Sequence, residues 1–233
     1  MPEIEIISKP LKSRIMGNPS KIIESGIEYS IGRFNGIKMF YDFEKILIYL
    51  DFKGKLLFGP DFQIHKRDEP IILKLCNYMV QDIKSCQKHD IDPQKNILLS
   101  GPVGCGKTTL LKLVQFIVPH QRPFEIIPCR NIVFGFNNLG FKIIEDYEKG
   151  GNYCFDDLGL EPLGSHYGRD FDVMGEILIS RYELFLTSKF KTHATTNLMS
   201  EELEERYGER VRSRMRKMFN LISFDLTSED KRK

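Results

Sequence analysis

A glycine-rich stretch between two apolar runs constrains this chain more than any other feature. The sequence from Gly101 to Thr109 reads GPVGCGKTT, with NILLS before it and LLKLVQFIV after it. Its glycines, Lys107 and Thr108 fit the pattern G-x-x-x-x-G-K-[ST] in full. In such a loop the backbone N–H groups turn inward around phosphate oxygens, and the helix that follows adds its positive end. The pattern predicts a phosphate-binding loop between a buried strand and a helix.

Each residue type within this loop has its own expected role in binding a triphosphate. Lys107 is expected to reach the β- and γ-phosphates of ATP, and the Thr108 hydroxyl is expected to ligate Mg²⁺. An ordinary glycine turn is the alternative, and the strand before and the helix after count against it. The other loop positions complete the expected nucleotide-binding set: Gly101, Pro102, Val103, Gly104, Cys105, Gly106 and Thr109.

The stretch NYCFDDLG supplies the acids that a phosphate loop needs on a second strand. Its apolar run ends in Asp156 and Asp157. Asp156 is expected to hold Mg²⁺, directly or through a water molecule, and Asp157 to orient and polarise the attacking water. Paired acids favour hydrolysis over nucleotide binding alone. Two loop acids that cap the next turn are the structural alternative, because Gly159 follows closely.

Strand and helix patterns alternate along the rest of the chain. A helix is predicted from Pro70, with an apolar face that continues to Ile83, and further helices within 131–149, 171–187 and 203–218. The stretch EPLGSHYGRD is interpreted as a loop, with His166 as a surface residue. Residues 1–57 are given no fold, and Gly54 is interpreted as a turn signal. The predicted strands are NILLS, FEIIPC, NYCFDD, THATTN and NLISFDL. This alternation predicts an α/β fold with a parallel sheet covered by helices on both faces, and ligands at the carboxyl ends of its strands.

The composition excludes several classes of protein. An apolar fraction of 41% is enough for a buried core, and a net charge of +2, from 34 basic and 32 acidic residues, neither demands nor excludes nucleic acid. The five cysteines show no C-x-x-C pairing, so we expect buried thiols. We see neither a signal peptide nor a run of membrane-spanning length, and expect a cytoplasmic protein with no membrane partner.

Five segments occur in a fixed order: GPVGCGKTTL, YCFDDLGLEP, ILISRYELFLTSKFKTHATTNL, ERYGERVRSRM and TSEDKR. Together they resemble AAA+ ATPases of the DnaC/IstB-like group, the bacterial helicase loaders and transposition helper ATPases, and above all short members from Bacteroidetes-type genomes. The resemblance covers about residues 58–232. It implies a P-loop NTPase core with a five-stranded parallel sheet at 58–233, and a small partner-binding region at 1–57. Because few residues follow the last predicted strand, we expect an abbreviated or absent C-terminal lid.

The resemblance also implies roles for three further residues. Asn197, in ATTN, matches the sensor-1 amide that contacts the γ-phosphate or the attacking water. Arg214, in RSRM, matches the arginine finger that enters the neighbouring subunit's site, with Arg210 and Arg212 as substitutes. Arg232 matches the sensor-2 arginine, here acting in cis from a tail. The structural alternatives are an asparagine that turns the chain after a strand and a solvated, basic helix face, which also suits nucleic acid.

The implied protein is an ATPase that assembles into a ring or spiral on binding ATP. The resemblance suggests a replicative helicase, a transposase or DNA as its partner. Phe134, Phe136 and Phe141 could stack on bases, but core packing is the favoured interpretation, and the span before YCFDD has room for about one helix. A nucleotide-gated adaptor with little turnover stays open as an alternative. A small-molecule kinase is disfavoured, because ATTN and GERVRSRM have no role in one.

Overall fold

The structure is a computed structural model that describes residues 4–11, 18–188 and 190–231. Contacts between Cα atoms divide the chain into two compact units. The first comprises Met1–Pro93 and Thr109–Arg122, and the second Gln94–Thr108 and Pro123–Lys233. The boundary that we predicted near residue 57 separates the residues without ATPase motifs from those with them, and it does not coincide with the boundary between the compact units. It stays a prediction about function.

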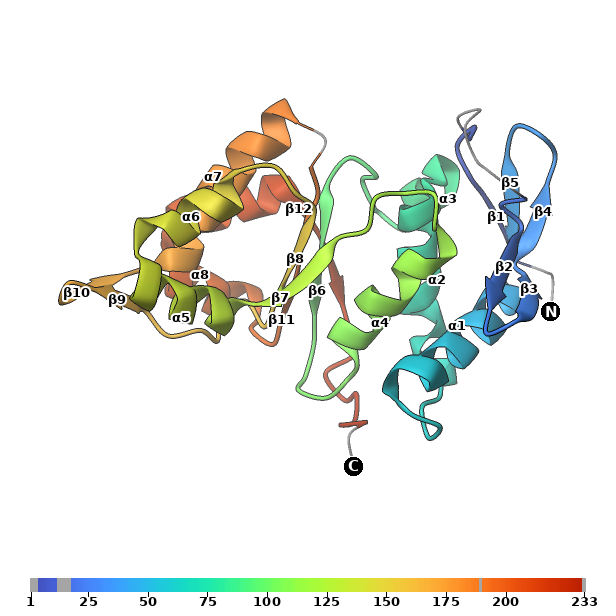
Figure 1. Cartoon of the computed structure of the whole chain (residues 1–233), viewed down its shortest axis with the longest axis horizontal. Helices are drawn as coiled ribbons and strands as arrows, with labels where there is room; N and C mark the ends of the chain where they lie inside the picture. The colour runs from blue at the N-terminus through green and yellow to red at the C-terminus, as the bar shows by residue number, and fades with distance from the viewer. Residues whose placement is uncertain (1–3, 12–17, 189, 232–233) are drawn as a thin grey trace. The chain divides into compact units, whose positions relative to one another are not determined.

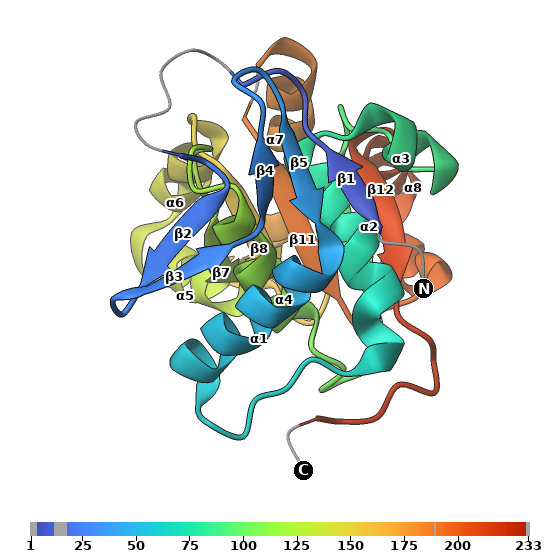
Figure 2. The same cartoon turned by 90° about the vertical axis from the view of Figure 1, so that its right-hand side faces the viewer.

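The first unit contains an antiparallel sheet, a hairpin and several helices. In the sheet, β5 (Met39–Asp42) lies between β1 (Glu5–Ile7) and β4 (Gly32–Phe34), as Figure 2 shows. The hairpin is formed by β2 (Lys21–Glu24) and β3 (Ile27–Ser30). The helical segments are α1 (Phe43–Phe58), η1 (Lys66–Asp68), α2 (Glu69–Val80), α3 (Ile83–Lys88), most of α4 (Lys107–Val114) and η2 (Gln115–Ile117).

Two local predictions for this unit were wrong. Gly54 is not a turn residue: it lies inside α1, where an added Cβ would come within 2.0 Å of the Phe62 ring, so the glycine serves close packing. The predicted helix from Pro70 does not continue to Ile83. It ends as α2 before Gln81, which has a left-handed φ of 61°, and Asp82 then caps α3 by accepting from the Ser85 N–H.

The second unit is built on the five-stranded parallel sheet that the sequence predicted (Figure 1). Its strands occur in the order β12-β6-β11-β8-β7, and every neighbouring pair is parallel. The first strand of the unit, β6, lies between β12 and β11 and is almost fully buried, which explains its continuous apolar run. The bounds are β6 Asn96–Ser100, β7 Glu125–Pro128, β8 Tyr153–Asp156, β11 Thr192–Thr196 and β12 Phe219–Ser223.

Helices α5 (Cys129–Leu139), α6 (Phe141–Glu148), α7 (Val173–Thr187) and α8 (Ser200–Met218) pack on one face of this sheet (Figure 1). Their shared core includes Phe136, Phe155, Met174, Ile177 and Met215. Where we expected about one helix before β8, the chain forms both α5 and α6, because Gly140 interrupts the helix with a φ of 63°. Helix α8 is also interrupted, at Gly208, where φ is 77° and ψ is 162°.

The segment interpreted as a loop is a short hairpin. Strands β9 (Gly164–His166) and β10 (Arg169–Phe171) pair antiparallel across a two-residue turn. Tyr167 and Gly168 both have positive φ, at 50° and 71°, as a type I′ turn requires. The loop interpretation was wrong because one of the two turn residues is a tyrosine, which masks the turn pattern.

Other expectations concern the whole chain. All five cysteines are buried free thiols, as predicted. From Phe224 to Lys231 the described chain contains turns and no helix. Within the described ranges, no helix combines the length and the apolar character needed to cross a membrane.

Candidate nucleotide-binding site

The candidate residues gather where three neighbouring strands end. Parallel strands β6, β11 and β8 are adjacent, so their carboxyl ends meet at one edge of the sheet. The phosphate loop follows β6, Asp156 ends β8, and Asn197 directly follows β11. The Gly101 N–H donates to the Thr196 carbonyl at 3.2 Å, which joins the ends of β6 and β11. The structure therefore brings the predicted loop, acid and amide together in one unit.

The phosphate loop has the backbone that its pattern predicts. Gly104 and Gly106 have φ values of 78° and 101°, which favour glycine. The buried Lys107 ammonium donates to the carbonyls of Gly101 at 2.9 Å and Pro102 at 2.8 Å. Burial lowers the pKa of Lys107 below its ordinary value, and charges that include Asp157 and Asp156 oppose this shift. The lysine thus lies inside the loop, as a phosphate-binding lysine must.

Asp156 connects the loop to the sheet. The Thr108 hydroxyl donates to Asp156 Oδ1 at 2.6 Å, and the Thr195 hydroxyl donates to the same oxygen at 2.6 Å. Thr195 Oγ1 also accepts from the Asp157 N–H at 2.9 Å, so one hydroxyl orders both acids. Asp157 has a left-handed φ of 57°, uncommon for a residue other than glycine. Such backbone strain is often found at functional sites.

The donor set at this point fits Mg²⁺. Thr108 and Asp156 offer hydroxyl and carboxylate oxygens, and Mg²⁺ is usually bound by one or two protein oxygens together with phosphates and water. Among the described residues there is no cluster of three or more His, Cys, Asp or Glu side chains that could enclose a metal ion. A site of this kind relies on the nucleotide for its remaining ligands.

Asn197 contains an unsatisfied polar atom. Its Oδ1 is buried and has no hydrogen-bond partner in the part of the chain that the structure describes. Unpartnered buried side-chain oxygens are uncommon in folded proteins, and an absent ligand or water is one of the usual reasons. Asn197 directly follows β11, and β11 lies between β6, which precedes the loop, and β8, which ends at Asp156.

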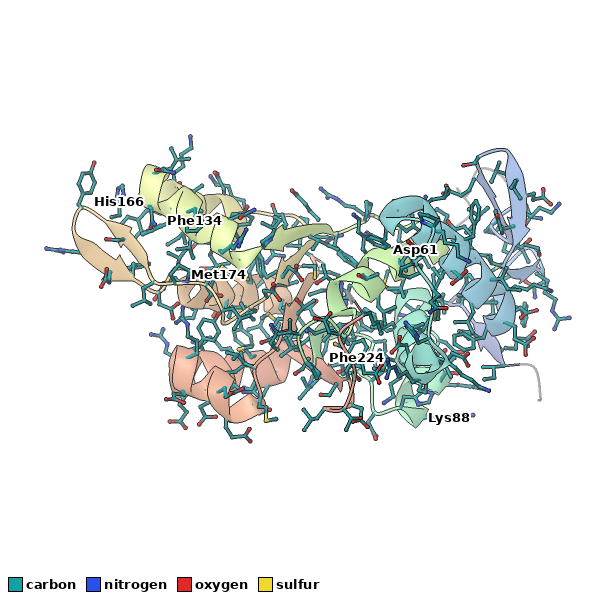
Figure 3. All side chains as sticks on the ribbon, turned by 90° about the horizontal axis from the view of Figure 1, so that it is seen from below. Asp61, Lys88, Phe134, His166, Met174 and Phe224 are labelled. Atoms are coloured by element: carbon teal, nitrogen blue, oxygen red, sulfur yellow. The ribbon has the colours of Figure 1, made fainter. Side chains whose placement is uncertain are left out.

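The segment after β12 returns to the phosphate loop. Phe224, labelled in Figure 3, donates its N–H to the Ser100 carbonyl at 2.8 Å. Lys231 donates from its backbone N–H to the Gly104 carbonyl at 3.1 Å and from its ammonium to the Cys105 carbonyl at 2.6 Å. An added Cβ on Gly104 would lie 1.9 Å from the Asp230 carboxylate. The sequence did not predict these contacts, and Arg232 lies outside the described residues.

The candidate finger residues differ in their surroundings. Arg210 is exposed. Arg212 is buried and donates to the carbonyl and hydroxyl of Ser200, at the start of the same helix. Arg214 is half-buried, donates to the Arg210 carbonyl at 3.2 Å, and lies over the Tyr182 ring, with its Nε buried and unpartnered within the described chain. The hydrogen bonds of Arg212 and Arg214 thus end on α8 itself.

The aromatic residues of α5 and α6 fall into two groups. Phe136 is buried and stacks on Phe171, so the core interpretation holds for it. Phe134 and Phe141 are 52% and 57% exposed. His166, labelled with Phe134 in Figure 3, is half-buried, and its ring lies where a Cβ on Gly140 would be.

The sequence interpretation missed two kinds of residue at the site. Thr195 orders the acids, and Thr196 donates to the Leu158 carbonyl at 2.7 Å, so both threonines hold the turn after β8. Their signal was a pair of adjacent threonines at the end of a predicted buried strand. Glu161 is the first residue of the segment interpreted as a loop and has no predicted role, yet its side chain is fully buried. An acid without exposure is rare unless it is paired.

The sheet order and the phosphate loop define a P-loop NTPase fold of the AAA+ type. In particular, the chain is similar to the crystal structure of the DnaC helicase loader, with 20% identity, a TM-score of 0.51, and coverage of 71% of this chain and 94% of that one. This likeness shows the shared fold and confirms the fold that the resemblance implied. The structure of DnaI is 19% identical, with a TM-score of 0.49 and coverage of 71% of this chain and 89% of that chain.

Sequence comparison adds little. No family model matches the chain. A curated protein, ATP-binding cassette sub-family D member 1 of Drosophila melanogaster, is 28% identical over 87 residues, or 33% of this chain. The match spans only 11% of that protein's length.

Proposed function

We propose that the chain binds ATP together with Mg²⁺ and hydrolyses it. The observation that carries this proposal is the hydrogen-bonded chain from Thr108 through Asp156 to Thr195, which connects the loop after β6 to the acid that ends β8 and to β11, the strand between them. A structural glycine turn would have no need for this acid. The match to a protein named as an ATP-binding cassette agrees with the proposal.

Each residue has a role that its position supports. The phosphate oxygens are bound by the loop from Gly101 to Thr109, with Lys107 supplying positive charge. Thr108 and Asp156 hold Mg²⁺, which when bound neutralises charge on the phosphates. Asp157, one residue further along the turn, orients the attacking water and accepts its proton. The Asn197 amide contacts the γ-phosphate through its NH2 group or binds that water, and only the water could donate to its buried oxygen.

We further propose that the chain acts as a AAA+ helicase loader or transposition helper, on DNA or on a DNA-processing protein such as a replicative helicase or transposase. The fold likeness to a protein named as a helicase loader supports this class. In this proposal the protein is cytoplasmic, and ATP binding drives assembly into a ring or spiral. Arg214 then enters the neighbouring site, Arg232 contacts the γ-phosphate in cis, and residues 1–57 bind the partner.

The test is ATP hydrolysis and nucleotide binding by purified variants in the presence of Mg²⁺. Lys107→Ala is expected to abolish binding or hydrolysis, because it removes the charge inside the loop. Lys142→Ala, at an exposed position on α6, is the matched control and should retain both. Unchanged hydrolysis in Lys107→Ala would disprove the assignment of the loop.

A second variant separates the enzyme from the adaptor alternative. Asp157→Asn keeps the shape of the turn but removes the carboxylate that orients water. An enzyme loses turnover in this variant and still assembles with ATP. An adaptor with little turnover shows the same low rate of phosphate release before and after the change.

A further inference from the structure

Glu161 lies between helix α8 and the turn after β8 that contains Asp157 and Gly159, which we call the acid turn. None of the proposed catalytic roles uses Glu161. Its side chain is 0% exposed, although it is an acid in the segment after β8. Burial raises the pKa of Glu161 above its ordinary value, while hydrogen bonds from Tyr207 and Gly159 and the charge of Arg206 oppose the shift. A carboxylate in such a position is costly unless its partners hold it in one geometry.

One side of this carboxylate belongs to the acid turn. Glu161 Oε2 accepts from the Gly159 N–H at 2.8 Å. Within the same turn, the Leu160 N–H donates to the Asp157 carbonyl at 3.2 Å, and Thr195 holds the Asp157 N–H. The backbone turn that Glu161 contacts is therefore joined to Asp157 by a hydrogen bond.

The other side belongs to α8. Glu161 Oε1 accepts from the Tyr207 hydroxyl at 2.6 Å and from Arg206 at 3.1 Å. Arg206 also contacts Asp172 Oδ1 at 3.4 Å and the Glu161 carbonyl at 3.4 Å. Arg206 thus belongs to this cluster, although its spacing of four and eight residues from Arg210 and Arg214 predicts that the three share one helix face.

The helix is interrupted directly after these contacts. Gly208 has a φ of 77° and a ψ of 162°, a conformation that is almost confined to glycine. Backbone hydrogen bonds of an unbroken helix therefore do not fix the direction of the half that follows. That half carries Arg210, Arg212 and Arg214. Its direction depends on the hydrogen bonds from Arg212 to Ser200, which span the break, and on contacts beside the break, of which the hydrogen bond from Tyr207 to Glu161 is the shortest.

We propose that Glu161 is a positioning residue that couples the acid turn to the arginine-bearing half of α8. Nucleotide bound at Asp156 and Asp157 sets the position of the acid turn. Glu161 moves with the turn and shifts Tyr207, which lies at the helix break. The nucleotide state of one subunit then sets the position of its own α8 arginines, and these arginines enter the site of the neighbouring subunit. This inference rests on the proposed nucleotide-binding function, and it adds a physical link between two sites of one ring.

A fluorescent probe on α8 tests the coupling without requiring hydrolysis. Ser213 is exposed on the second half of α8, and the five native thiols are buried, so Ser213→Cys can be labelled selectively with an environment-sensitive maleimide dye. Saturating ATP with Mg²⁺ is expected to change the dye's emission. Glu161→Gln should abolish this change while altering nucleotide affinity by no more than about twofold, because it leaves the loop intact.

Matched variants separate coupling from loss of structure. Glu148→Gln removes an acid that accepts a hydrogen bond from Ser180 on α7, outside the site, and should retain the emission change. Tyr207→Phe removes only the hydroxyl and should also abolish the emission change. It replaces Glu161→Gln in the test if that variant does not fold. Thermal unfolding of each variant shows whether the fold is intact.

Hydrolysis by mixed subunits gives the second measurement. Glu161→Gln is expected to lower turnover by about 5- to 150-fold, the usual range of coupling between two sites. Mixing it with Asp157→Asn, which has an intact α8 and still binds ATP, should restore part of the rate, because its subunits supply arginines placed by a bound nucleotide. No recovery would mean that Glu161 acts only within its own site and would overturn the inference.

The remaining outcomes distinguish the two proposals. A wild-type chain that fails to bind nucleotide overturns the proposed function and the inference together. A wild-type chain that binds nucleotide without any emission change, or a Glu161→Gln variant that keeps the change, overturns the inference alone.

Discussion

Thr195 shows how one side chain organises the candidate site. Its hydroxyl donates to Asp156 and accepts from the backbone of Asp157. The loop and the acids were predictable because each has a sequence pattern of its own. The role of Thr195 was not, because it depends on β11 lying between β6 and β8, and the order of strands in a sheet is not encoded in any local pattern.

His193 gives a prediction about pH. It is fully buried in β11, where its Nδ1 accepts from the Ile97 N–H at 3.1 Å and its ring packs edge-on against Phe124. Burial, aided by Lys191, lowers the pKa of His193 from 6.5 to about 3. At pH values between these two pKa values, His193 binds a proton in the unfolded chain but not in the folded chain. Stability is therefore present above pH 6.5 and is lost as the pH falls toward 3, by up to about 1.4 kcal/mol per unit.

Urea unfolding across this pH window tests the prediction. His193→Asn keeps an acceptor for Ile97 but cannot be protonated, so its free energy of unfolding should depend less on pH than that of the wild type. His65→Asn is the control, and it should leave the acid sensitivity as it was. Equal pH dependence in wild type and His193→Asn would contradict the assignment.

Among the elements, those that the sequence predicted well are the ones whose pattern is local. The five strands of the parallel sheet follow apolar runs, and α7 follows an apolar periodicity. The failures occur at single residues that change the direction of the backbone or the packing. Gly140 divides α5 from α6, Tyr167 supplies a left-handed turn position, and Gly54 makes room for Phe62. In each case the deciding contact comes from elsewhere in the chain or from a φ value that the residue type alone does not impose.

The break in α8 gives a prediction at this scale. Gly208→Ala places a Cβ on a residue whose backbone conformation suits glycine, at a cost of about 1–3 kcal/mol unless the helix straightens. Either response disturbs the neighbouring contact between Tyr207 and Glu161. We expect nucleotide binding to persist and hydrolysis to fall.

A matched glycine controls for backbone strain. Gly168 also has a positive φ, of 71°, and has open space around it, so Gly168→Ala imposes a similar local strain away from α8. Circular dichroism, nucleotide affinity and phosphate release should be measured for both variants. A Gly208→Ala variant with full turnover would show that the break has no part in the reaction.

At the scale of the whole molecule, the described candidate residues belong to one compact unit, formed by Gln94–Thr108 and Pro123–Lys233, except for Thr109. That unit contains the loop, the two acids and the Asn197 amide. The sequence predicted this unit's fold class because its motifs are tied to the ends of strands. The prediction that Arg214, with Arg210 and Arg212 as substitutes, serves a neighbouring subunit stays a prediction, since that role depends on an interface between chains.

A finger supplied in trans makes activity depend on assembly. Isolated subunits should hydrolyse ATP slowly, and the rate per subunit should rise with protein concentration, because a finger can contribute about 10³- to 10⁵-fold to turnover. Arg214→Ala should bind nucleotide and lose most of its turnover. Arg216→Ala removes an exposed arginine that pairs with Glu204, and it is the control.

Mixed assemblies then identify the direction of the contact. Arg214→Ala retains a complete phosphate loop, and Lys107→Ala retains the finger. Their mixture should recover part of the activity that neither shows alone. A rate per subunit that is independent of concentration, together with no recovery, would exclude the trans arrangement.

The buried Arg181 has a consequence for how the second unit reaches its final form. Its guanidinium donates to the carbonyls of Tyr147, Lys149, Gly151 and Lys191 and to the Thr192 hydroxyl. These oxygens come from the end of α6, the approach to β8 and the start of β11. A cation can leave water here only once these segments have converged, so we expect its burial to be a late step of folding. Contacts that form after the rate-limiting step mainly slow unfolding, so the loss of Arg181 is expected to speed unfolding more than it slows folding.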